Sequence, residues 1–145
     1  MGKLFAIAGR PLSGKTEYIR KMKKYSDDSL LVTSALVYPD FETMMQKLSG
    51  CITANDKFMC IVIDDFEESL IEHYGKADYR KYKQSLKMLV GLTRNLGVDI
   101  YISVVLKRKA DWKGSIYCSY KYLRSKAIYE ETDGVFFLKA DYESI

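Results

Sequence analysis

Continuous apolar runs alternate along this chain with segments whose apolar residues recur every three or four positions. The runs are typical of strands buried on both faces, and the spaced patterns are typical of amphipathic helices. The runs predict five strands, near residues 4–8, 30–33, 58–65, 98–106 and 134–138. Because strands and helices alternate, we expect an α/β fold in which helices cover both faces of one mainly parallel, five-stranded sheet.

The helices are predicted from periodicity and end signals. Asp40 is a suitable N-cap for a helix from Phe41 to Leu48, which Ser49 and Gly50 should end. Other helices are expected from the first strand's loop to about residue 24, over 66–72, over 86–96 with Gly97 at its end, and over 123–130. We find no repeat, low-complexity tract or linker, so residues 1–145 are predicted to form one domain.

The loop after the first predicted strand matches the phosphate-binding pattern G-x-x-x-x-G-K-[ST], known as Walker A or the P-loop. Its residues are Gly9, Arg10, Pro11, Leu12, Ser13, Gly14, Lys15 and Thr16. Glycines let the backbone turn its N–H groups toward a phosphate, and the following helix start favours the same anion. Lys15 should reach the β- and γ-phosphates of ATP, and the Thr16 hydroxyl should ligate Mg²⁺.

Two carboxylates end the third predicted strand. An acid at this point is where P-loop proteins hold the Mg²⁺ shell, the Walker B position, and we assign Asp64 to it. The adjacent Asp65 could polarise a water molecule. The alternative is an acidic turn that caps the next helix.

Composition limits the other possibilities. Hydrophobic residues make up 48% and charged residues 29% of the chain, with a net charge of +4. No apolar run is long enough to span a bilayer, and Met1 leads directly into the first strand without a signal peptide. The three cysteines are widely spaced and form no zinc pattern. These features predict a cytoplasmic protein with no membrane partner, and they permit a nucleic-acid partner.

Several stretches resemble the ATPase domain of replicative DnaB-family helicases. Residues 9–16 resemble that family's R-P-x-x-G-K-T version of Walker A, and residues 85–89 with 95–98 resemble its S-L-K-x-L helix. Residues 106–108 resemble the L-N-R that ends its fourth strand, and residues 123–133 resemble its L-R-E-S-G-A-I segment. The resemblance implies a RecA-type core with the P-loop strand between the last two strands and the Walker B strand beyond the fourth.

The departures from this family concern hydrolysis. Leu36 stands where the family has its catalytic glutamate, and Val105 stands where it has a sensor glutamine. The family's arginine finger lies on strands beyond the fifth, which the sequence does not reach. We therefore expect weak or absent ATP hydrolysis by the chain alone, with Asp65 or Glu67 as the candidate substitutes for the missing base.

The family's DNA-binding loops follow Walker B and the fourth strand, and here both stretches are basic and aromatic. A cationic track with stacking side chains suits single-stranded DNA. The candidate residues are Lys76, Arg80, Lys81, Lys83, Lys107, Arg108, Lys109, Trp112 and Lys113. The alternative is an amphipathic surface in which lysine stems lie on aromatic rings.

Other functions remain open at this level. A GTPase would need an Asn-Lys-x-Asp motif, which is absent from the sequence. A small-molecule or nucleotide kinase would need a lid, for which residues 107–124 are a candidate. A non-catalytic accessory subunit would bind ATP or ADP and dock on a helicase or on copies of itself, and the missing catalytic residues favour it.

Overall fold

The computed structural model describes residues 2–9, 27–74, 79–105 and 123–138. Five strands form one sheet: β1 (Leu4–Gly9), β2 (Leu30–Ser34), β3 (Cys60–Asp64), β4 (Asp99–Val105) and β5 (Gly134–Leu138). Their order across the sheet is β2-β3-β4-β1-β5, and every pairing is parallel. The predicted α/β class and the five strands are confirmed, and the strand order is the one that the family resemblance implies.

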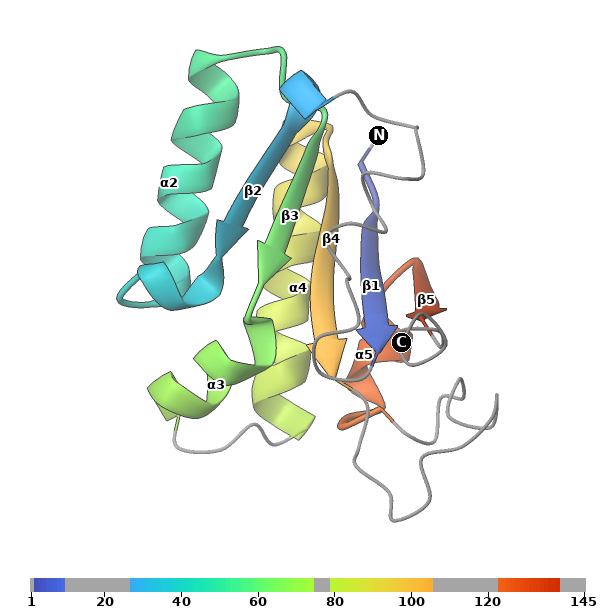
Figure 1. Ribbon diagram of the computed structural model, residues 1–145. Coiled ribbons are helices and arrows are strands. Elements are labelled where there is room, and N and C mark those ends of the chain that lie inside the picture. Colours follow the sequence, from blue (N-terminus) through green and yellow to red (C-terminus); the bar gives the residue numbers. More distant parts are fainter. Residues whose placement is uncertain (1, 10–26, 75–78, 106–122, 139–145) are drawn as a thin grey trace, which may run out of the picture.

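All the strands point the same way, so their carboxyl ends meet at one edge of the sheet (Figure 1). The register brings specific strand ends level with each other. Gly9 at the end of β1 pairs with Val105 at the end of β4, and Ser34 at the end of β2 pairs with Asp64 at the end of β3. Ligands of open parallel sheets bind outside this edge.

Helix α2 (Phe41–Ala54) begins as predicted, because the Asp40 Oδ1 atom accepts a 2.6 Å hydrogen bond from the Thr43 N–H. Its predicted end at Gly50 is wrong, since the helix continues to Ala54. Gly50 lies in open space, and Ile52, one turn after Leu48, is buried in the core. Packing of Ile52 outweighs the modest cost of a glycine inside a helix.

Helix α4 (Tyr79–Leu96) begins earlier than expected and includes residues that we predicted in a basic loop. Its buried positions recur every three or four residues, which places them on one face: Tyr82, Ser85, Leu86, Leu89, Leu92 and Thr93. The early start follows from Tyr82, whose ring is fully buried against Phe66. Gly97 ends the helix with a φ of 69°, as predicted for a C′ glycine.

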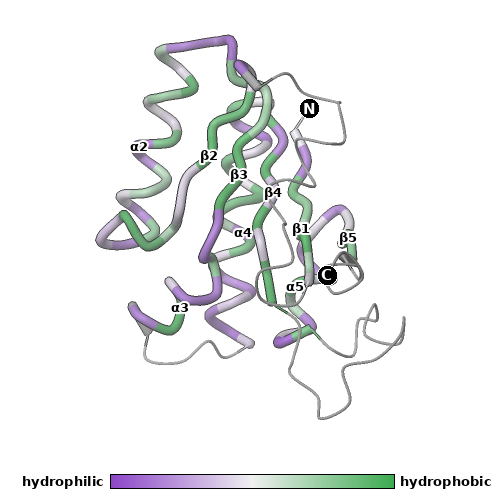
Figure 2. Tube along the Cα trace, viewed as in Figure 1, coloured by the Kyte–Doolittle hydropathy of each residue, from purple (hydrophilic) through white to green (hydrophobic). Residues whose placement is uncertain are grey.

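The main core lies between the sheet and helices α2, α3 (Phe66–Tyr74), α4 and α5 (Ala127–Glu131). Figure 2 shows the pattern behind it, with mostly hydrophobic strands and helices that alternate between hydrophobic and hydrophilic residues. A smaller cluster on the opposite face includes Ile7, Val62 and Tyr101. The helix predicted to follow the P-loop falls in residues 10–26, outside the described residues. Within the described ranges, no helix is long and apolar enough to cross a membrane.

Candidate nucleotide site

The candidate site lies at the carboxyl edge of the sheet, where the P-loop sequence leaves β1. Gly9 is the last residue of β1 and is buried between Val105 of β4 and Leu138 of β5. The remaining P-loop residues, 10–16, lie outside the described residues, as do Lys76, Lys107, Arg108, Lys109, Trp112 and Lys113. The described part of the chain therefore shows where the P-loop begins, which is a central strand of the sheet.

Asp64 ends β3 and is half-buried at the same edge. Only β4 separates β3 from β1, so the two strands are about 10 Å apart at the usual strand spacing. No cluster of three potential metal-binding side chains occurs among the described residues. Mg²⁺ at nucleotide sites needs only one or two carboxylates, because phosphates and waters supply the other ligands. The chemistry of Asp64 therefore fits the predicted Mg²⁺ role.

Asp65 turns away from the strand direction immediately after Asp64. Its φ is 61°, a left-handed conformation that residues other than glycine adopt infrequently. The Ser34 hydroxyl donates a 2.6 Å hydrogen bond to Asp65 Oδ2 and accepts one of 3.2 Å from the Leu36 N–H. Among the contacts of the described residues, the Asp65 side chain bonds Ser34 and does not cap α3. Sequence reasoning missed Ser34, whose only signal was its place at a strand end.

Glu67, in the first turn of α3, is completely buried. Its Oε1 atom accepts a 2.7 Å hydrogen bond from the Val105 N–H, and its Oε2 atom accepts one from the Tyr82 hydroxyl. Burial raises the pKa of Glu67, although both hydrogen bonds and the charge of Arg124 act in the opposite direction. The carboxylate thus joins α3, α4 and the end of β4, with no exposed surface to offer a water molecule.

Two apolar side chains stand where the resembled family has polar catalytic groups. Leu36 lies in a short 3-10 helix, η2 (Ala35–Val37), directly after β2, and is 42% exposed. Val105 is the last residue of β4, and its N–H is occupied by Glu67. Neither side chain can accept a proton or orient a water by hydrogen bonding.

The described basic candidates lie on the first turns of α4. Lys83 is held against α5, with its Nζ atom 3.2 Å from Glu131, 3.5 Å from Glu130 and 3.0 Å from the Tyr79 hydroxyl. Lys81 is half-buried and Arg80 is exposed. Arg80 is therefore better placed than Lys83 to meet a phosphate backbone.

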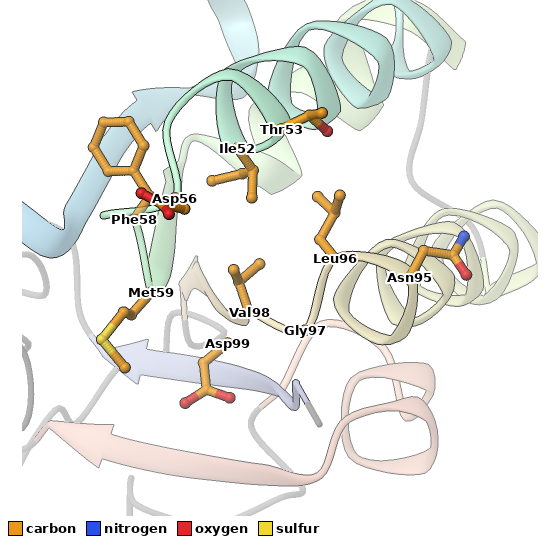
Figure 3. Close-up of a pocket in the computed structure, with 10 residues that line it drawn as sticks. All are labelled: Ile52, Thr53, Asp56, Phe58, Met59, Asn95, Leu96, Gly97, Val98 and Asp99. Atoms are coloured by element: carbon orange, nitrogen blue, oxygen red, sulfur yellow. The ribbon is translucent and has the colours of Figure 1, made fainter.

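A cavity of about 650 Å³ lies at the opposite edge, between the ends of α2 and α4 and the starts of β3 and β4. Figure 3 shows Ile52, Leu96 and Val98 pointing into it, with Asp56 and Asp99 at its margin. Because β3 and β4 begin there and their carboxyl ends face away, this cavity is separate from the candidate nucleotide site.

No protein-family model matches the sequence, and no curated protein matches it. The fold matches 135 chains of known structure, so it is a common one that does not identify a function. One of them is the ATPase domain of a DnaB-like protein, with a TM-score of 0.68 and 14% sequence identity. The match covers 93% of this chain and 68% of that domain. At this identity the likeness concerns the fold alone, and the chain has the RecA-like α/β fold of P-loop ATPase domains.

Proposed function

We propose that the chain binds ATP with Mg²⁺ through residues 9–16 and Asp64, and acts in DNA replication or recombination. One observation carries the nucleotide site: a complete Walker A sequence begins where central strand β1 ends, and Asp64 ends β3 at the same edge. The likeness of the fold to an ATPase domain supports the proposal.

Each group has a distinct role in the proposed site. The P-loop backbone surrounds the phosphates of ATP or ADP, and Lys15 faces the β- and γ-phosphates. Thr16 and Asp64 would hold Mg²⁺, which when bound neutralises charge on the phosphates. With Leu36 and Val105 in place of polar catalytic groups, hydrolysis by the chain alone is weak or absent.

Lys15→Ala is expected to weaken ATP binding without unfolding the domain. A hydrogen bond to a charged group contributes about 1.5–3 kcal/mol, which corresponds to a loss of about 10- to 100-fold in affinity. Isothermal titration calorimetry with ATP and Mg²⁺ measures it. Lys47→Ala, on the exposed side of α2, removes the same charge elsewhere and should bind like the parent. Equal affinities for Lys15→Ala and the parent, or no binding by the parent, would refute the site.

Single-stranded DNA is the proposed macromolecular partner, bound through Arg80 and the basic residues near 76–83 and 107–113. Its affinity should fall steeply as salt rises, because binding to phosphates releases counterions. Trp112→Ala should cost about 1–3 kcal/mol if its ring stacks on a base. Fluorescence anisotropy at several salt concentrations tests both, with Lys47→Ala as the control. Affinity that does not change with salt would contradict DNA binding.

A non-catalytic accessory subunit is the second candidate, and exposed apolar residues favour it. Leu36 is 42% and Val37 70% exposed on η2, next to the candidate nucleotide site. Such a surface suits docking on a helicase or on another copy of the chain when nucleotide is bound. Size-exclusion chromatography with and without a non-hydrolysable ATP analogue tests association between copies.

A further inference from the structure

We propose that Ser34 is a positioning residue that holds Asp65 as the base for a slow hydrolysis of ATP. This inference rests on the proposed nucleotide site and extends it. It places the base on the β3 turn, whereas the resembled family carries its glutamate after β2, where this chain has Leu36.

The backbone around Asp65 is built to aim its side chain. Ser34 and Asp64 are level in the sheet, so Asp65 is the first residue beyond the β2-β3 ladder. Its left-handed φ of 61° is unfavourable for a residue with a Cβ atom, and glycine would adopt it freely. A carboxylate at such a position, beside a predicted phosphate site, is the kind of strain that accompanies function.

The Ser34 hydroxyl is fixed in direction by two contacts. It accepts a hydrogen bond from the Leu36 N–H, so its own proton goes to Asp65 Oδ2. Asp65 Oδ1 accepts no hydrogen bond from a described residue and belongs to a half-exposed side chain. Ser34 thus holds one carboxylate oxygen, and the other is free to accept a proton from water.

The neighbouring acids are less suitable. Glu67 is completely buried, with both oxygens occupied by Val105 and Tyr82. Asp64 is the proposed Mg²⁺ ligand. Glu68 is exposed on α3 and has no hydrogen bond that would orient it, among the contacts of the described residues. Within residues 64–68, Asp65 alone combines partial exposure with an oriented carboxylate.

The reaction is the transfer of the γ-phosphoryl group to water. The water oxygen forms a bond to the γ-phosphorus while its proton moves to Asp65 Oδ1. The bond between the γ-phosphorus and the β–γ bridging oxygen breaks, and its electron pair leaves with ADP. Asp65 then returns the proton to solvent, so neither an oxidant nor a further reactant is needed.

Single-turnover hydrolysis, with the chain in excess over radiolabelled ATP and Mg²⁺, tests this assignment. Removing a general base typically slows a reaction by about 10²–10⁴-fold, and Asp65→Asn should do so. Ser34→Ala should slow the step at least tenfold, and Ser34→Thr, which keeps the hydroxyl, should restore it. Glu68→Gln is the matched control and should react like the parent. The dissociation constant for ATP should be unchanged in all four.

Several results would overturn the proposal. They are Ser34→Ala or Asp65→Asn reacting at the parental rate, Ser34→Thr reacting as slowly as Ser34→Ala, or ATP bound by the parent and never hydrolysed. A purely structural role for Ser34 would lower thermal stability and leave the rate per bound ATP unchanged. Absence of ATP binding by the parent would instead refute the nucleotide site itself, so the two failures can be distinguished.

Discussion

ATP turnover by the purified chain is expected to stay far below 1 s⁻¹, the lower end of the usual enzymatic range of about 1–10³ s⁻¹. Phosphoryl transfer to water needs an oriented nucleophile and stabilisation of the developing charge. Leu36 and Val105 provide neither, because their side chains are apolar and the Val105 N–H already serves Glu67. A steady-state phosphate-release assay, with and without single-stranded DNA, measures the rate.

A gain of activity provides the sharper version of this test. Leu36→Glu places a carboxylate at an exposed position next to β2, where the resembled family has its base. We expect it to raise turnover at least tenfold, since a positioned base contributes about 10²–10⁴-fold. Val37→Glu adds the same charge one residue later, at a position that is more exposed, and should have no effect.

Two outcomes would contradict the expected slow turnover. A parental rate on the order of 1 s⁻¹ would mean that the groups present suffice for catalysis without a glutamate after β2. Turnover that appears only when a sugar or nucleoside is added would indicate a kinase, with phosphoryl transfer to that acceptor in place of water.

Glu67→Ala should lower the free energy of unfolding by about 2–5 kcal/mol, because it leaves two donors without a partner in the core. The Val105 N–H and the Tyr82 hydroxyl both donate to this carboxylate, and neither can reach water without opening the core. Glu68→Ala, at the next residue on the exposed side of α3, should change stability by less than about 0.5 kcal/mol. Urea denaturation of both variants and the parent measures the difference. Equal losses for the two substitutions would show that the buried contacts contribute nothing specific.

The same carboxylate should make stability depend on pH. Burial raises the pKa of Glu67 above its value of 4.5 in the unfolded chain, so the folded protein retains the proton to higher pH. Its contribution is therefore complete below about pH 4.5 and declines as pH rises through the folded-state pKa. Tyr82, Arg124 and Glu68 are the charged or titratable groups that act on it. Glu67→Gln should remove this decline, and a pH profile parallel to that of the parent would contradict it.

The strands and their order could be predicted because the information is local. Each strand is a short apolar run, and the motifs at the ends of β1 and β3 constrain which strands lie near each other. The two helix boundaries that were wrong depend on distant packing. Ile52 carries α2 past Gly50, and Tyr82 carries α4 back to Tyr79, and in both cases the deciding contacts are with the core.

The candidate site shows the same division. The P-loop and Asp64 are recognised from residue type and spacing, although residues 10–16 fall outside the described structure. Glu67 looked equivalent to Asp65 in the sequence, since both follow Asp64 closely. Their difference comes from β2, which supplies Ser34 to one, and from α4 and β4, which enclose the other. No local pattern contains that information.

The tie at Glu67 has a consequence for how homologous chains can diverge. One of its two donors, the Val105 N–H, belongs to the backbone, so no substitution at position 105 short of proline removes it. The other donor is a side-chain hydroxyl, which a single tyrosine-to-phenylalanine replacement removes. Position 67 should therefore keep a hydrogen-bond acceptor over long evolutionary distances. Position 82 is free to alternate between the two aromatic residues, and the solvent-facing position 68 is free to drift.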